Sequence, residues 1–259
     1  MTVFVLMLLL QPVLAVLVWR LARHRPRLAV GFMLGGGGFV LLLAVLSDRP
    51  AWEAALFPFL DYVKYQGFSL YLGAAVFFGA TFARLATRLD RTAIAVLFLT
   101  LVLYSGLANR WLLVGELYGS ETFADANLHC QESTIYTCGP AACVAALAHC
   151  GVRVTERQMA GLCLTNPTGT GICNVYRGVT LALQGTAYHA ALRDPPVEAL
   201  LAKGSIAVLC LPGHAITVVG EGDQVLVHDP SALAPGHWGL ELLRKVYTGT
   251  AVFLEPRPR

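Results

Sequence analysis

The sequence predicts two fold classes in one chain: an α-helical transmembrane N-terminal region with four spans, followed by an α+β domain. Of the 259 residues, 56% are hydrophobic and only 14% are charged, and the apolar residues crowd into the first 110 positions. Beyond them, glycine and proline punctuate helix-like and strand-like segments, which is typical of a globular domain. We expect the transmembrane region at 1–109, a linker at 110–127 and the α+β domain at 128–259.

Four apolar windows predict the spans. Crossing a hydrocarbon core of about 30 Å takes about 20 helical residues at about 1.5 Å each. The windows are 2–19, 28–46, 67–83 and 92–107. The last two are short and need flanking residues. A cleavable signal peptide is the alternative for the first window, but its basic cluster follows the apolar run instead of preceding it.

Basic residues in the loops predict the orientation. The loops after the first and third windows carry seven arginines: Arg20, Arg23, Arg25, Arg27, Arg84, Arg88 and Arg91. The loop after the second window carries only Arg49 and Lys64. The positive-inside rule makes the arginine-rich loops cytoplasmic, so both termini face outward and the lipid bilayer is a partner. These loops account for the net charge of +3, so no nucleic-acid partner is expected.

All seven cysteines lie between Cys130 and Cys210. In an oxidising compartment six of them would pair and one would remain, with about 15 possible pairings among six. The loop CLTNPTGTGIC makes Cys163 and Cys173 the first candidates for a disulfide bond. The alternative is that several cysteines are small buried hydrophobic residues. The spacing contains no C-x-x-C pair, which argues against a structural zinc site, and no metal or cofactor is expected.

The C-terminal domain reads as helices first and strands later, which indicates an α+β fold. A helix over 140–150 stops at Gly151, and Thr155 with Gln158 forms a capping box for a second helix ending near Cys163. Further helices are expected at 174–184 and in PPVEALLAKG. Strands are expected at 206–211, 215–219 and 225–228 and in TAVFLEP, and GEGDQ is a hairpin turn.

Cys138 precedes the helix that begins near Pro140, where the positive end of the helix dipole favours a thiolate. A nucleophilic thiolate needs a proton carrier and an orienting group. His214 and Asp229 stand on the predicted hairpin and supply both. Gln131 offers an amide N–H to an oxyanion beside the backbone N–H of Cys138. The alternatives are an unreactive core thiol, an ordinary strand histidine and an ordinary loop glutamine.

The remaining histidines are expected to be structural. His228 should point to the face of its strand opposite Asp229. The others match no motif and are expected at the surface or in packing: His129, His149, His189 and His237.

Three stretches, QESTIYTCGPAACVAALAHCG, GTGICNVYRGVTLALQG and GHAITVVGEGDQVLVHDPS, resemble peptidase family C39 over about 128–255. This family comprises the papain-like processing peptidases of bacteriocin exporters. The resemblance implies a papain-like cysteine peptidase fold, with Cys138 as nucleophile, His214 as general base and Asp229 as orienting acid. It also implies that Gln131 helps to bind the oxyanion, and that a peptide or protein precursor is cut after a Gly-Gly pair.

Three features depart from the family. Gln131 lies seven residues before Cys138, farther than is usual, and the chain has no Walker A motif. The four spans place the domain outside, whereas the exporter-borne peptidase works in the cytoplasm. We therefore predict a cysteine peptidase at the outer face of a bacterial cytoplasmic membrane, with a separate export or secretion complex left open as a partner. A catalytically silent peptide-binding or escort module and a thioester-based peptidyl transferase are the alternatives.

Overall fold

The computed structural model describes residues 2–47, 49–57, 59–64, 66–110 and 118–257. Its contacts divide the chain into two compact units, each made of two chain segments. The first unit comprises Met1–Arg49 and Asp61–Gly115, and the second comprises Pro50–Leu60 and Glu116–Arg259. Within the predicted linker, residues 111–117 lie outside the described part of the chain.

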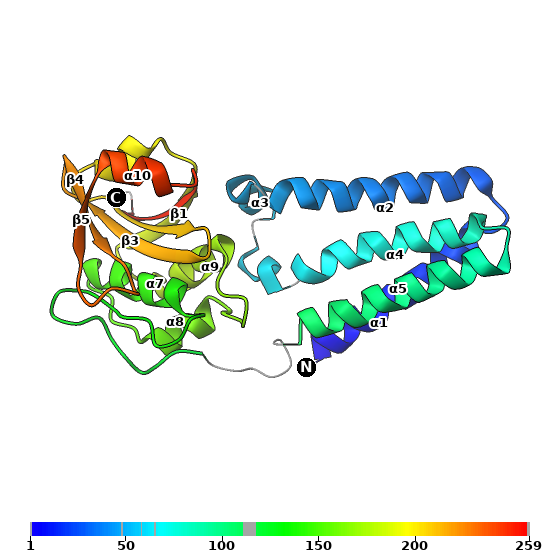
Figure 1. The fold of residues 1–259 in the computed structure, drawn as a ribbon, viewed down its shortest axis with the longest axis horizontal. Helices are drawn as coiled ribbons and strands as arrows, with labels where there is room; N and C mark the ends of the chain where they lie inside the picture. The colour runs from blue at the N-terminus through cyan, green and yellow to red at the C-terminus, as the bar shows by residue number, and fades with distance from the viewer. Residues whose placement is uncertain (1, 48, 58, 65, 111–117, 258–259) are drawn as a thin grey trace. The chain divides into compact units, whose positions relative to one another are not determined.

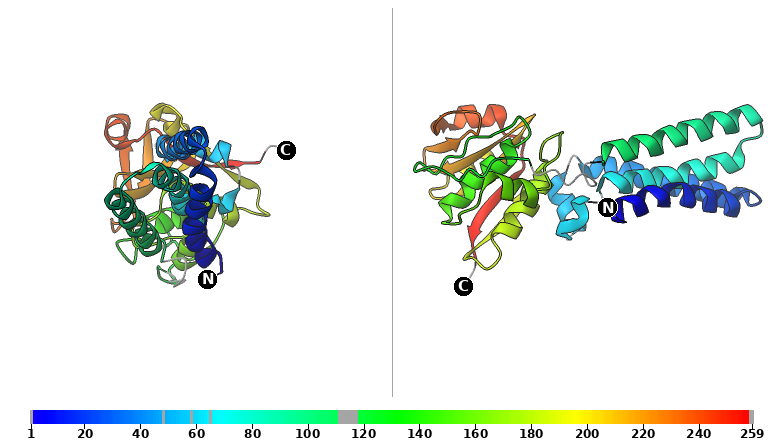
Figure 2. Two further views of the ribbon diagram at one scale, coloured as in Figure 1. Left: turned by 90° about the vertical axis from the view of Figure 1, so that its right-hand side faces the viewer. Right: turned by 90° about the horizontal axis from the view of Figure 1, so that it is seen from below.

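The first unit is a bundle of four helices: α1 (Thr2–Ala22), α2 (Pro26–Ser47), α4 (Gln66–Arg84) and α5 (Arg88–Ala108). Helix α4 packs against the other three (Figures 1 and 2). By length and composition, three candidate spans are present, at Phe4–Ala22, Pro26–Ser47 and Arg88–Ala108; the apolar part of α4, Phe68–Arg84, is shorter. Four apolar helices are therefore present at the predicted places, but only three qualify as spans among the described residues.

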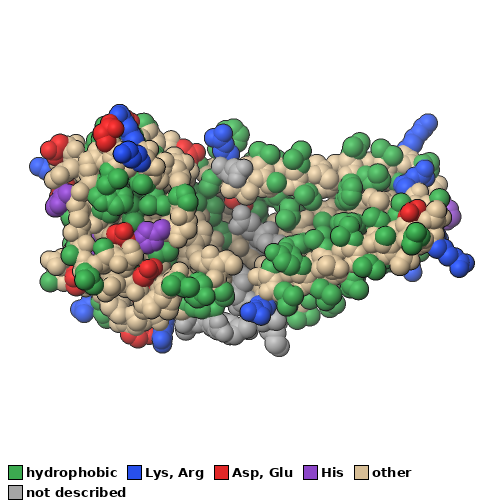
Figure 3. All heavy atoms as spheres, viewed as in Figure 1, with side chains coloured by type: hydrophobic (Ala, Val, Ile, Leu, Met, Phe, Trp, Pro, Cys, Tyr) green, Lys and Arg blue, Asp and Glu red, His purple; other side chains and the backbone are tan. Residues whose placement is uncertain are grey.

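The surface of the bundle suits a lipid environment. Hydrophobic side chains cover the sides of the helices, and Leu34 is 72% exposed (Figure 3). An exposed apolar area of this extent is typical of a membrane-facing surface. Lys and Arg side chains gather at the end of the bundle where α1 turns into α2 and α4 into α5 (Figures 1 and 3). Inside, Gln11 of α1 donates a buried hydrogen bond of 3.1 Å to Ser105 Oγ of α5, a polar link between two apolar helices.

The second unit contains a six-stranded antiparallel sheet in the order β1-β6-β2-β3-β4-β5. The strands are β1 (Tyr188–Arg193), β2 (Ile206–Leu211), β3 (His214–Gly220), β4 (Gln224–His228), β5 (Gly236–Gly239) and β6 (Ala251–Pro256). The helices are α3 (Pro50–Leu56), α7 (Cys138–His149), α8 (Glu156–Leu162), α9 (Ile172–Ala182) and α10 (Leu240–Val246), with the short 3-10 helix η2 (Val197–Leu201). The 3-10 helix η1 (Leu60–Lys64) lies at the boundary, with all but its first residue in the first unit.

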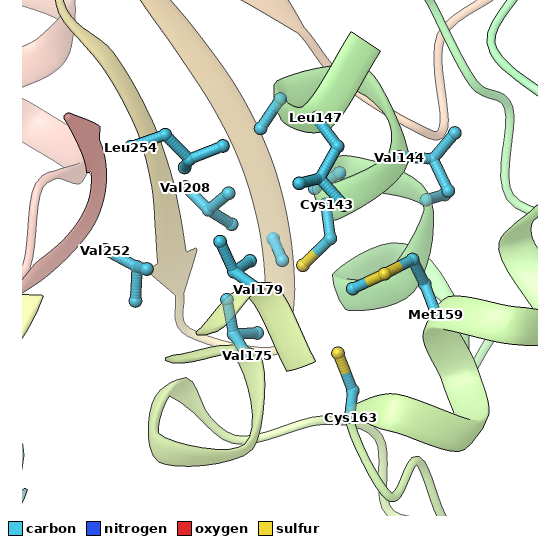
Figure 4. Packing of buried hydrophobic residues seen from close by; sticks show 14 of the residues in the cluster. Cys143, Val144, Leu147, Met159, Cys163, Val175, Val179, Val208, Val252 and Leu254 are labelled. Carbon is cyan, nitrogen blue, oxygen red and sulfur yellow. The ribbon is translucent and has the colours of Figure 1, made fainter. Parts of the chain in front are cut away.

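Two hydrophobic cores cover the two faces of the sheet. On one face α7, α8 and α9 pack through Val144, Met159 and Val175, and on the other α10 and η2 pack through Leu243 and Leu200 (Figures 1 and 4). Successive residues of a central strand point alternately into one core and the other, so the sequence of such a strand is continuously apolar.

Helix α7 lies close to β3 because small residues line it. Nine consecutive residues, from Gly139 to Leu147, are buried, and four of them are alanines. Thr217 of β3 donates a buried hydrogen bond of 2.6 Å to the backbone oxygen of Ala142. This contact fixes the position of α7 along the strand, and with it the positions of Cys138 and His214.

Most elements predicted for the α+β domain are confirmed. The capping box of Thr155 and Gln158 is present, Gly151 follows α7 with a φ of 72°, and β2 has the predicted bounds. The segment around 197–201 is a 3-10 helix, and the sequence did not predict β1, β5 or α10. Both unpredicted strands lie at sheet edges, where residues are only partly buried and the apolar signal is weak.

The predicted disulfide bonds are wrong: all seven cysteines are free thiols. Cys163 is buried and points with Cys143 and Met159 into the core (Figure 4). Cys173 lies in the first turn of α9, and its thiol donates to Glu53 Oε2 of α3 at 3.8 Å. The two ends of the loop thus face different neighbours. Cys143 and Cys163 are fully buried and pack as small hydrophobic residues, which was the alternative to disulfide bonding.

Gly178→Ala is expected to destabilise the second unit. A Cβ at this position of α9 would collide with Cys163 Sγ and lie 3.1 Å from the Cys163 nitrogen. Helix propensity alone would favour alanine by about 1 kcal/mol, whereas overpacking costs about 1–3 kcal/mol. We expect a net loss, measured by urea unfolding of the detergent-solubilised chain. In a Cys163→Ala background the same change should cost much less; equal costs in both backgrounds would contradict the steric explanation.

Candidate active site

Cys138 is the first residue of α7 and follows the N-cap residue Thr137. Thr137 is buried, accepts a hydrogen bond from the Thr134 backbone N–H at 3.1 Å and donates one to the Thr134 oxygen at 2.9 Å. This local turn ends the preceding loop and holds the half-buried Cys138 at the amino end of the helix. The thiol thus lies where the sequence predicts it.

His214 and Asp229 meet at one end of the β3–β4 hairpin. His214 begins β3 and Asp229 directly follows β4, and the antiparallel pairing brings these two chain positions together. His214 Nε2 lies 2.7 Å from Asp229 Oδ1, which also accepts from the Ser231 backbone N–H at 2.9 Å and from Ser231 Oγ at 2.7 Å. Burial acts to raise the pKa of Asp229, but these hydrogen bonds outweigh it and lower that pKa. An ionised Asp229 has no proton, so His214 Nε2 carries the shared one.

Cys138, His214 and Glu132 converge on one point. The Cys138 sulfur, a His214 ring nitrogen and a Glu132 carboxylate oxygen all lie within 4.8 Å of one another. Asp229 contacts Nε2 of His214, so Nδ1 is the ring nitrogen of His214 that remains for other contacts. The donor atoms of these three side chains are also close enough to hold a metal ion. No other group of three or more His, Cys, Asp and Glu side chains among the described residues meets that condition.

The structure brings together Cys138, His214 and Asp229, three of the four residues predicted from the sequence, and adds Glu132 to them. Gln131 is exposed, whereas Glu132 is half-buried and faces the site. The Glu132 backbone N–H donates to the Pro230 oxygen at 3.0 Å, which anchors this loop beside Asp229. Sequence reasoning missed Glu132. The available signal was its position in the sequence: Glu132 lies six residues before Cys138, one residue nearer than Gln131.

Two opposing influences set the proton affinity of Cys138. Burial raises the pKa of the thiol and the nearby Glu132 carboxylate raises it further, while the backbone N–H groups of Gly139, Ala215 and Cys138 lower it. The end of the helix therefore favours the thiolate, as expected, but the net pKa lies above the ordinary value. Burial and the Glu132 carboxylate thus favour the protonated thiol of Cys138 over the thiolate.

Burial also raises the pKa of Glu132. His214 acts in the opposite direction, and Asp229 and Glu156 add to the increase. Four ionisable groups thus influence one another near the thiol: Glu132 from the loop before α7, His214 and Asp229 from the hairpin, and Glu156 from α8.

Three other histidines, His129, His149 and His228, form a separate cluster. His228 is fully buried at the end of β4, and its Nε2 lies 2.9 Å from His149 Nε2 of α7. The ring of His129 stacks on His228 with 5.9 Å between centroids, and His129 Nε2 contacts the Ala232 oxygen at 2.9 Å. His129 and His228 are buried and His149 is half-buried, which agrees with the expectation that these histidines are structural.

Comparison with known proteins gives a resemblance to two solved structures. No protein-family model matches the chain, and no curated protein matches it. The peptidase domain of Streptococcus ComA, a bi-functional ABC transporter involved in a quorum-sensing pathway, is 20% identical, with a TM-score of 0.42, and the match covers 49% of this chain and 97% of that one. A double glycine motif protease from an AMS/PCAT transporter, solved with the leader peptide, is 19% identical, with a TM-score of 0.43, over 54% and 97% of the two chains.

Proposed function

We propose that this chain is a membrane-anchored cysteine peptidase that cuts a peptide or protein precursor at the outer face of a bacterial cytoplasmic membrane. The observation that carries the proposal is the placement of Cys138 at a helix amino end, within 4.8 Å of a His214 ring nitrogen, while His214 Nε2 lies 2.7 Å from Asp229 Oδ1. A nucleophile, a base and a group that orients the base is the arrangement that covalent acyl transfer requires.

The reaction follows from these positions. His214 Nδ1 takes the thiol proton as Cys138 attacks the peptide carbonyl, and the ionised Asp229 stabilises the imidazolium that forms. The imidazolium then protonates the departing amine, which leaves a thioester on Cys138. His214 next removes a proton from water, which attacks the thioester and releases the acid and the free thiol. The raised pKa of Cys138 makes the first proton transfer a necessary part of the attack.

The oxyanion of each tetrahedral intermediate needs hydrogen-bond donors. The backbone N–H of Cys138 at the start of α7 is one such donor, since the first N–H groups of a helix have no intrahelical acceptor. Gln131, the side-chain donor expected from the sequence, is exposed. For this site we therefore propose an oxyanion hole built first on the backbone at the helix start.

The test of the proposed function is cleavage of a synthetic peptide that carries Gly-Gly before the scissile bond, with a matched peptide in which both glycines are valine. Purified full-length chain in detergent should cut only the first peptide, after the second glycine, as shown by mass spectrometry. Equal cleavage of both peptides would contradict the Gly-Gly preference. Binding without cleavage would favour the escort module, and transfer of the acyl group to an added amine would favour the peptidyl transferase.

Asp229→Asn is expected to reduce kcat/KM by about 10- to 100-fold, less than the loss of the nucleophile. The amide oxygen can still accept from His214 Nε2 and from Ser231, so the His214 ring keeps its orientation. The site loses the negative charge of the Asp229 carboxylate, which stabilises the imidazolium. Asp229→Ala should cost more, because it removes the acceptor as well. Steady-state kinetics of both variants give the comparison; equal activity of Asp229→Ala and wild type would exclude the orienting role.

For the anchor we propose four spans, with α4 crossing together with its flanking residues. The two arginine-rich loops would then be cytoplasmic, and the second unit would lie outside. An alkaline phosphatase fusion after residue 259 should be active, and a reporter that fluoresces only in the cytoplasm should stay dark there. The reverse result would overturn both the orientation and the proposed site of action.

A further inference from the structure

The trio Glu132, Cys138 and His214 offers three kinds of metal ligand from three separate chain segments. Its donor atoms lie within 4.8 Å of one another, and each side chain is partly buried. In a tetrahedral zinc site the metal–sulfur distance is about 2.3 Å and the metal–nitrogen and metal–oxygen distances are about 2.0 Å, so ligand atoms stand about 3.3–3.8 Å apart. The donor atoms of the trio therefore have to approach one another by about 1.5 Å at most. Rotation about the side-chain bonds of Glu132, in the loop before α7, supplies that movement.

The surroundings of His214 suit metal binding. Nε2 contacts Asp229 Oδ1 at 2.7 Å, and Ser231 fixes that carboxylate in turn. A histidine that binds a metal through one nitrogen commonly donates the other N–H to a carboxylate, which fixes the ring and strengthens the ligand. Nδ1 of His214 is thus oriented towards the trio before any ion arrives.

The ligand chemistry selects the ion. One sulfur, one imidazole nitrogen and one carboxylate oxygen form a mixed set that suits zinc, whereas hard ions such as Mg²⁺ prefer oxygen alone and Cu⁺ prefers soft sulfur ligands. A thiolate and a carboxylate together carry two negative charges, which a divalent cation neutralises. Three protein ligands leave one position for water.

We propose that Glu132, Cys138 and His214 bind one Zn²⁺ ion reversibly and that the bound ion switches off the thiol. Zinc displaces the Cys138 proton to solvent, forms a zinc–sulfur bond and occupies the His214 nitrogen that would serve as base. The nucleophile and the base are then both blocked until zinc leaves. The binding site stands on its own geometry; only the clause on inhibition rests on the proposed function.

The test begins with zinc titration calorimetry of the reduced, chelator-treated full-length chain in detergent. We expect one zinc per chain at this site, loss of that site in Cys138→Ala, and affinity weaker by at least about 10-fold in Glu132→Gln, which removes the charge and keeps the shape. Asp223→Asn is the matched control, because Asp223 is exposed in the turn at the opposite end of the same hairpin. It should bind zinc like wild type.

A second readout avoids peptide cleavage. One equivalent of zinc should slow iodoacetamide labelling of Cys138, identified by peptide mapping, in wild type and Asp223→Asn but not in Glu132→Gln. Equal zinc affinity of wild type and Glu132→Gln, or a Cys138 labelling rate that zinc does not change, would overturn the proposal. If zinc binds and protects Cys138 while the metal-free chain cuts no peptide, the zinc site stands and the peptidase proposal fails.

Discussion

Cys138→Ala is expected to abolish peptide cleavage, with kcat/KM reduced by at least about a thousandfold. The thiol is the atom that forms the thioester, and no neighbouring residue can take over that bond. The change removes one atom from a half-buried residue in the first turn of α7, so the fold should persist. Cleavage of the Gly-Gly peptide, with circular dichroism to verify folding, gives the measurement.

Cys150→Ala is the matched control. Cys150 caps the other end of the same helix, is also half-buried, and burial raises the pKa of its thiol to about 11. It lies away from His214 in sequence and structure, so its loss should leave cleavage unchanged. Retained cleavage in Cys138→Ala, or equal losses in both variants, would place the nucleophile elsewhere.

Acid is expected to destabilise the second unit through His228. Burial, and after it the neighbouring His149 and His129, lower the pKa of His228 from 6.5 to about 4, while Asp125 acts in the opposite direction. Burial lowers the pKa of His149 as well. When His228 is protonated, both of its ring nitrogens carry a proton, so neither can accept a hydrogen bond, and a charge is placed in a fully buried position.

The sign follows from proton linkage. The unfolded chain binds a proton at His228 near pH 6.5, whereas the folded chain does so only near pH 4, so lowering the pH favours the unfolded state. The contribution of His228 to stability is therefore complete above about pH 6.5 and is lost progressively towards about pH 4. Between about pH 7 and about pH 5 the free energy of unfolding should fall by about 2 kcal/mol from this residue.

Urea unfolding of the detergent-solubilised chain, followed by near-ultraviolet circular dichroism at several pH values, measures this loss. His228→Gln should be less stable at neutral pH but should lose less stability in acid. His237→Gln is the control, since the His237 side chain is 51% exposed, and it should keep the wild-type slope. Parallel pH curves for wild type and His228→Gln would show that another group causes the acid sensitivity.

The sequence predicts the central strands and the three residues Cys138, His214 and Asp229 at their observed places. Strand β2 is continuously apolar because both of its faces are buried, and such a run has few other interpretations. The hairpin between β3 and β4 follows from its turn residues, and it brings His214 to Asp229 without any long-range information.

Glu132 could not be placed in the same way. Its direction depends on the backbone hydrogen bond to Pro230, a contact between two loops distant in the sequence. No periodicity governs side-chain direction in such a loop, so the sequence could not predict that Glu132 faces the thiol. The disulfide prediction failed for a related reason. The number of cysteines indicates how many could pair, whereas pairing depends on where each side chain points.

Helix α3 gives the second unit a discontinuous boundary. The segment Pro50–Leu60 is encoded between two apolar helices but folds with the sheet, where α3 packs on α9 and β1. Glu53 is 4% exposed there and accepts from the Cys173 thiol. A gene fragment that starts at residue 110 or 128 would therefore omit part of the domain's own surface and leave Cys173 uncovered. Expression of the second unit by itself calls for a permuted design in which 50–60 is fused back through a flexible spacer.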